Sequence, residues 1–129
     1  MKSWGAGKVI GTIAAYLNSL GTLPPIGIEY LPEKLDACVG LFTWDCPDDG
    51  DGTSTRFVQV RVRDTSFEGA MDKCIAILEL LDSEREEKPL PVLWKGKPII
   101  CIVRRRPILY DRDAARVTVY AEIALWGQN

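Results

Sequence analysis

Residues 56–81 read RFVQVRVRDTSFEGAMDKCIAILELL, and this stretch decides the fold. In its first half, valines stand at every second position and polar side chains stand between them. A period of two is typical of a strand with one buried face and one face turned to solvent or a partner. The two sets are Val58, Val60 and Val62 against Gln59, Arg61 and Arg63.

The second half of the stretch predicts an amphipathic helix. Thr65 is the expected N-cap, and Glu68 three residues later completes a capping box. One apolar stripe then runs along the helix, made of Phe67, Ala70, Met71, Cys74, Ile75, Leu78 and Leu81. Ile77 and Leu80 fall off this stripe, and two interpretations stay open: a loop or hairpin covers them, or they are contacts between subunits.

The whole chain of 129 residues is expected to form a single domain, spanning residues 1–129. Its net charge of −2 gives no overall attraction to nucleic acid or to an anionic membrane. The first twenty residues resemble a signal peptide, but their glycines and the helical spacing of their apolar residues favour a helix of the domain. No apolar run is long enough to span a membrane, so no membrane partner is expected.

The remaining segments predict the order helix, strand, strand, helix and then three strands. This order indicates an α+β domain with a mostly antiparallel sheet of about five strands and two helices packed on one face. The expected segments are a helix over 3–20, an irregular connection over 22–36, strands over 38–44 and 56–63, a helix over 65–81, a hairpin over 92–106, a turn over 107–114 and a strand over 116–126.

The residues that usually carry catalysis are scarce. The chain has no histidine, which removes the commonest general base and the commonest metal ligand. Its four cysteines show no CxxC spacing and are expected to be reduced and buried; a zinc site or a disulfide framework is the less favoured alternative. They are Cys38, Cys46, Cys74 and Cys101. We therefore predict no enzyme, no metal and no cofactor.

An acidic, glycine-rich loop is expected over residues 45–55. It holds Asp45, Asp48, Asp49 and Asp51. The spacing fails the EF-hand pattern for calcium, because Pro47 stands where the first carboxylate is needed. A solvated hairpin tip is the favoured interpretation, and a docking loop for a basic partner is the sharper one.

Arginine and aromatic residues gather on the strand faces turned away from the valines. The simplest interpretation is a set of strand-end charges paired with Asp64, Asp111 or Asp113. The sharper hypothesis is an interface with another subunit or protein, since Arg and aromatic side chains are enriched in interface cores. Such faces also bind single-stranded nucleic acid, which the negative net charge disfavours. The candidate interface residues are Gln59, Arg61, Arg63, Arg105, Arg116, Tyr120, Trp126, Ile77 and Leu80.

Two long segments carry a resemblance to a known family. They are VQVRVRDTSFEGAMDKCIAILELL (58–81) and RRPILYDRDAARVTVYAEIAL (105–125). In order and character they resemble the tail terminator, or tail completion, proteins of tailed bacteriophages, a group that includes proteins described as minor capsid proteins. Pro107, Asp111 and a following arginine, Arg112 or Arg116, fit the segment that leads into the last strand of that family.

The resemblance implies a structural virion protein without catalytic residues. Such proteins form a ring, usually a homohexamer, on the head-proximal end of the tail tube, where they end tail polymerisation and join tail to head. The implied partners are other copies of the chain, the tail tube protein, the head–tail connector proteins, and DNA that passes through the lumen without sequence-specific binding. The implied location is the virion tail at the head–tail junction, after assembly in the host cytoplasm. The alternatives are a small α+β ligand-binding or regulatory domain without catalytic activity and, less favoured, an enzyme that uses carboxylates.

Overall fold

The alternating segment forms strand β3 (Arg56–Asp64), and helix α2 (Phe67–Leu81) follows it after a two-residue turn. Both belong to a computed structural model that describes residues 9–43 and 56–127. The other elements are α1 (Val9–Ser19), β1 (Ile26–Ile28), β2 (Cys38–Thr43), α3 (Ser83–Glu86), β4 (Leu93–Trp94), β5 (Lys97–Arg112) and β6 (Val117–Gly127).

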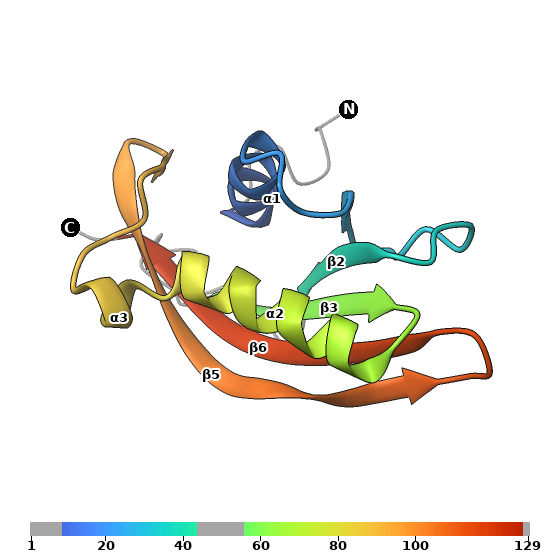
Figure 1. Ribbon diagram of the computed structural model, residues 1–129. Helices are drawn as coiled ribbons and strands as arrows, with labels where there is room; N and C mark the ends of the chain where they lie inside the picture. Colours follow the sequence, from blue (N-terminus) through green and yellow to red (C-terminus); the bar gives the residue numbers. More distant parts are fainter. Residues whose placement is uncertain (1–8, 44–55, 128–129) are drawn as a thin grey trace.

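The strands form one curled, mixed sheet in the order β1-β2-β3-β6-β5-β4 (Figure 1). All neighbouring pairs are antiparallel except β1 and β2, which run parallel. Helix α2 packs on β3, β5 and β6, whereas α1 packs near β1, β2 and β4 on the same side of the sheet. The predicted α+β class with a mostly antiparallel sheet is therefore confirmed, although its details differ.

The differences lie at three places. A short strand, β1, forms inside the connection that was expected to be irregular, because Ile26–Ile28 is an apolar segment that adds to the edge of β2. Helix α3 follows α2 directly. Strand β5 continues to Arg112 and so takes up most of the segment 107–114 that was expected to be a turn, and the hairpin tip lies at 113–116.

Strand β5 passes Pro107 because its register against β6 shifts there. The pairing jumps between Arg105 and Ile108, and proline is tolerated where a ladder hydrogen bond is already missing. Further shifts occur between Val103 and Arg105 and between Leu109 and Asp111. These irregularities bend the strand and explain its curved course in Figure 1.

The start of α2 corrects the predicted cap by one residue. Ser66, not Thr65, is the N-cap, and its hydroxyl accepts a hydrogen bond from the Gly69 amide at 3.0 Å. The Thr65 amide instead donates to the Asp64 carboxylate at 2.7 Å. The Asp64 carboxylate accepts this hydrogen bond because Asp64 is the last residue of β3 and stands directly before Thr65.

Asp64 also binds α2 through the Lys73 ammonium group. Gly69 leaves room for this contact, since a Cβ at that position would lie 2.6 Å from an Asp64 carboxylate oxygen. Burial alone raises the pKa of Asp64, but hydrogen bonds from Lys73 and Thr65 outweigh it and lower the net pKa. The ionised carboxylate thus links β3 to α2.

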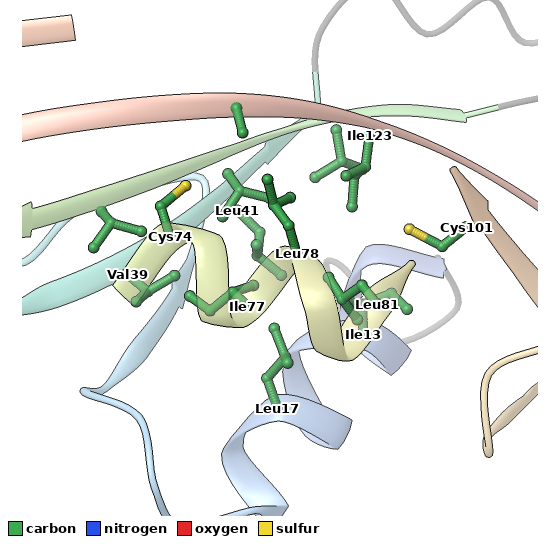
Figure 2. Packing of buried hydrophobic residues seen from close by; sticks show 14 of the residues in the cluster. Ile13, Leu17, Val39, Leu41, Cys74, Ile77, Leu78, Leu81, Cys101 and Ile123 are labelled. Atoms are coloured by element: carbon green, nitrogen blue, oxygen red, sulfur yellow. The ribbon is translucent and has the colours of Figure 1, made fainter. Parts of the chain in front are cut away.

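The core lies between the sheet and the two helices. The buried face of α2 includes Ile77, which is fully buried with Leu17 of α1 and Val39 of β2 in the same cluster (Figure 2). The predicted stripe missed Ile77 because α2 has two neighbours, the sheet and α1, and so buries a wider face than a single contact requires. At the start of the stripe, Phe67 remains 40% exposed.

The segment after α2 covers part of the edge of β5. The Cys101 amide donates to the Ser83 hydroxyl at 3.0 Å, and the Leu90 amide donates to the Ile99 carbonyl at 2.8 Å. Strand β4 pairs with β5 only at Lys97 and Pro98. In the described ranges, no strand pairs with this edge of β5 further along, so residues 104–112 form an open edge.

Candidate interaction surface on the outer face of the sheet

The outer face is the side of the sheet turned away from α1 and α2. Residues paired across antiparallel strands share a face, and the register places Arg61 of β3 opposite Tyr120 of β6. Gln59 lies opposite Glu122 in the same way. The structure thus brings the predicted residues of β3 and β6 together on one face.

Arg61 lies against two aromatic rings on this face. Its guanidinium carbon lies 3.9 Å from the centre of the Phe42 ring and 4.4 Å from the centre of the Tyr110 ring. Its Nε donates to the Gln59 side-chain oxygen. Two rings and one amide hold the guanidinium in place, and no carboxylate of the described residues forms an ion pair with it. Arg61 therefore presents a half-buried positive charge that two rings and the Gln59 side chain position on this face.

Aromatic side chains extend this cluster across the sheet. Tyr110 packs edge to face on Tyr120, with ring centroids 5.7 Å apart. Tyr110 remains 49% exposed and Ile108, which pairs with Tyr120, remains 41% exposed. We call Phe42, Arg61, Ile108, Tyr110 and Tyr120 the aromatic-arginine cluster.

Sequence reasoning missed Phe42, Ile108 and Tyr110. The segment 107–114 was expected to be a turn because it contains a proline and three charged residues. Its apolar side chains were therefore not assigned to either face of the sheet. Three consecutive apolar residues, Ile108–Tyr110, were the available signal, since turns seldom carry such a run. Phe42 lies in a predicted strand, but only the structure shows that its ring reaches Arg61.

Arg63 has a structural role in this chain. Its Nη1 donates to the backbone carbonyl of Pro32 at 2.8 Å and to that of Leu35 at 3.4 Å. These carbonyls belong to the segment 29–36, which follows β1 and crosses toward the outer face. The structure therefore commits Arg63 to holding this segment rather than leaving it open for a partner.

Arg116 holds the same segment from the other side. Its guanidinium donates to the Glu33 carbonyl, and its Nε pairs with the Asp36 carboxylate at 3.1 Å. The sequence suggested that such arginines pair with Asp64, Asp111 or Asp113. Arg116 does form an ion pair, but its partner is Asp36. Together, Arg63 and Arg116 bind this segment to the sheet through its backbone carbonyls and the Asp36 carboxylate.

Gly40 is the residue that lets segment 29–36 lie so close. A Cβ at Gly40 would meet the Phe42 ring at 2.7 Å and the Tyr30 carbonyl oxygen at 2.8 Å. Any larger residue would push one of these two neighbours away. Gly40 therefore supports both the segment and the cluster around Arg61.

The rest of the predicted residues of this face lie toward the other end of the sheet. Arg105 approaches Glu122 at 3.7 Å, with about half of the Arg105 side chain exposed. Trp126 is half-buried opposite Ile100. Arg104 lies over the Phe57 ring at 5.2 Å. These residues share the outer face but are not part of the aromatic-arginine cluster.

Ile77 and Leu80, the two α2 residues predicted as possible contacts, differ in burial. Ile77 belongs to the core, as described above. Leu80 is 39% exposed near the end of α2 and remains a candidate contact. The acidic residues Asp45, Asp48, Asp49 and Asp51 lie outside the described residues.

A polar hollow of roughly 400 Å³ opens near the hairpin tip. It is lined by Glu33, Arg63, Asp111, Asp113, Arg116 and Thr118. Asp113 accepts hydrogen bonds from the amides of Ala115 and Arg116, at 2.8 and 2.9 Å, and these bonds lower its pKa. The hollow is thus formed largely by groups that already bind parts of the fold.

The cysteines of the described part are free and buried, as predicted for Cys38, Cys74 and Cys101. Burial raises the pKa of Cys74 to about 12 and also raises the pKa of Cys101. A thiol with so high a pKa is a poor nucleophile at neutral pH. Cys46 lies outside the described residues.

Groups of three or more residues able to hold a metal ion do not occur within 9–43 and 56–127. None of the helices described has the length and apolar character needed to cross a membrane. No protein-family model matches the chain, and a search of curated proteins finds no significant match.

Proposed function

We propose that this protein is a structural virion protein that forms a ring on the head-proximal end of a phage tail tube, where it ends tail polymerisation and joins tail to head. The proposal joins the resemblance of residues 58–81 and 105–125 to tail terminators with the geometry of the β5–β6 hairpin. The implied assembly is a homohexamer around a lumen through which DNA passes. Its implied partners are the tail tube protein and the connector.

The observation that carries the proposal is the apolar surface on both faces of the hairpin end. Ile108 pairs with Tyr120 and belongs to the outer face, whereas Leu109 pairs with Val119 and belongs to the inner face. Leu109 is 46% exposed, because the hairpin projects past the start of α2 (Figure 1). Near it, Phe67 of α2 is also exposed and lies under Arg112.

Exposed apolar residues on opposite faces of one hairpin favour assembly through more than one surface. A twofold dimer needs a single self-complementary patch, whereas a ring uses two different patches on every copy. The outer patch is the aromatic-arginine cluster, and the inner patch is Leu109 with Phe67. The outer patch has the composition of an interface core, with tyrosine, phenylalanine and arginine in contact. A ring is the simplest closed assembly that buries both patches.

The test is the mass and the activity of the assembled protein. Native mass spectrometry and sedimentation are expected to show a closed oligomer, and electron microscopy with tail tubes is expected to show it at one tube end. Substitution Leu109→Ser, on the inner patch, is expected to weaken the oligomer without unfolding the chain. A protein that stays monomeric at all concentrations and never caps a tube would refute the proposal.

The second candidate is a ligand-binding or regulatory domain, which the polar hollow near the hairpin tip favours. A small anion or cation bound there would raise the melting temperature in a thermal-shift screen. Arg63 and Arg116 already bind segment 29–36, however, which leaves the hollow with few free donors. The ring is therefore the better-supported function.

A further inference from the structure

Two groups of exposed charges of opposite sign lie on two different elements of this chain. Positive charge gathers on β5, where Arg104, Arg105 and Arg106 are consecutive and exposed beside the open edge of the strand. Arg104 lies over Phe57, and the ion pair that Arg105 forms among the described residues is a long one, to Glu122. Arg106 forms no ion pair with any residue that the structure describes. We call these three residues the arginine run.

Negative charge gathers on the solvent side of α2. Glu68, Asp72 and Glu79 are exposed and stand at spacings of four and seven residues, which places them on one stripe of the helix. Inside the described part of the chain, no lysine or arginine forms an ion pair with them. We call these three residues the acidic stripe.

The position of Glu79 makes the end of this stripe electrostatically unfavourable. The last turn of α2 holds no basic residue, so Glu79 meets the negative end of the helix dipole without compensation. A cation supplied from outside the chain would relieve this repulsion. Leu80, exposed beside Glu79, adds apolar surface to the same place.

The arginine run and the acidic stripe of one copy do not satisfy each other. Helix α2 touches β5 through its buried side, so its stripe faces away from the sheet that carries the arginines. The charges are thus complementary in sign but separated by the thickness of the helix. Contact between two copies would bring these complementary surfaces together.

We infer that the arginine run on β5 docks against the acidic stripe of α2 in a second copy of this chain. The occupant is a second copy because one chain displays both complementary surfaces. Both surfaces are exposed, and among the described residues no ion pair joins the arginine run to the acidic stripe. Apolar residues accompany both, with Ile108 further along β5 and Leu80 on α2. The inference deepens the proposed ring, on which it rests, by naming one contact that joins neighbours.

The experiment exchanges the charges across the proposed contact in the full chain. Glu79→Arg and Arg106→Glu are each expected to weaken oligomer formation by on the order of tenfold or more, because each places like charges together. The double variant restores opposite charges at every contact and is expected to recover most of the wild-type oligomer. Sedimentation at several concentrations measures all three dissociation constants.

Two features of the design separate docking from folding. Glu79→Arg places a cation at the end of a helix, which favours the helix, so a lost oligomer would not reflect unfolding. Lys34→Glu is the matched control for Arg106→Glu, because it makes the same change of charge on the exposed segment 29–36. The control is expected to leave the oligomer within about twofold of the wild type. Circular dichroism checks that every variant is folded.

The outcomes distinguish this contact from the ring itself. An oligomer that ignores both single reversals, or a double variant no better than either single one, overturns the docking contact and leaves the proposed ring standing. A wild-type chain that is monomeric in low salt overturns both. Recovery in the double variant, with weakening of the wild type as sodium chloride rises from 0.05 to 0.5 M, supports the contact, since exposed pairs are screened over that range.

Discussion

The two halves of β5 belong to the same strand and the same β6 partner, yet they have opposite environments. In the first half, Ile99 and Cys101 are fully buried, and Ser83 and Leu90 bind the edge of the strand. In the second half, Ile108, Leu109 and Tyr110 are exposed and the edge is open. The difference shows that an apolar residue in a β-strand can be either buried in the core or exposed to solvent, and that the strand pattern alone does not distinguish the two cases.

The features of the second half oppose uncontrolled aggregation. Consecutive arginines, Pro107 and repeated register shifts are features that keep an open edge from pairing with any other strand. The exposed apolar residues are therefore limited to contacts made through side chains. Such a surface suits a specific neighbour better than an added strand.

The largest expected effect in this comparison is in the buried half. Ile99→Ala removes a fully buried side chain and should lower the free energy of unfolding by roughly 2–5 kcal/mol. Urea denaturation of the variant measures this loss. An effect as small as that of an exposed site would show that the first half is as open as the second.

The edge contact of the same half is expected to matter next. Ser83→Ala leaves the buried Cys101 amide without its acceptor, at a cost of about 1–3 kcal/mol. Denaturation of this variant, together with hydrogen exchange at Cys101, measures the loss. Slow exchange at that amide in the variant would contradict the structural role of Ser83.

Lowering the pH is expected to reduce the free energy of unfolding by less than Ile99→Ala does, because it protonates Asp64, which binds α2 through Lys73. The folded pKa of Asp64 lies below its unfolded value of about 3.9, so the ionised group stabilises the fold above that pH. This contribution should disappear as the pH falls through the folded pKa. Comparing unfolding free energies of the wild type and Asp64→Asn from pH 7 to pH 2 checks it, and the two curves should converge at low pH.

The smallest effect on folding is expected in the exposed half. Ile108→Ser should change the free energy of unfolding by only about 0.5 kcal/mol, because the side chain is 41% exposed. The same substitution should weaken oligomer formation measured by sedimentation. A large loss of stability in the isolated chain would show that the two halves do not differ in the way described.

The candidate surface was predictable in part. The alternation in β3 places Gln59 and Arg61 on the face away from the core, and the structure agrees. The partners of Arg61 were not predictable, because Phe42 and Tyr110 come from strands on opposite sides of β3. Their positions depend on the sheet order and on a register shift that no local pattern reveals.

The sequence by itself determined the elements whose pattern is local: the valine alternation of β3, the apolar stripe of α2 and the α+β class. Tertiary structure alone decided the roles of Arg63, Arg116 and Ile77. The two arginines bind segment 29–36, which lies about thirty residues from Arg63 and about eighty from Arg116 along the chain. Ile77 is buried because α1 packs near α2. The physical reason is the same in each case: period and capping depend on near neighbours, whereas the partner of a side chain depends on which distant segment the fold places beside it.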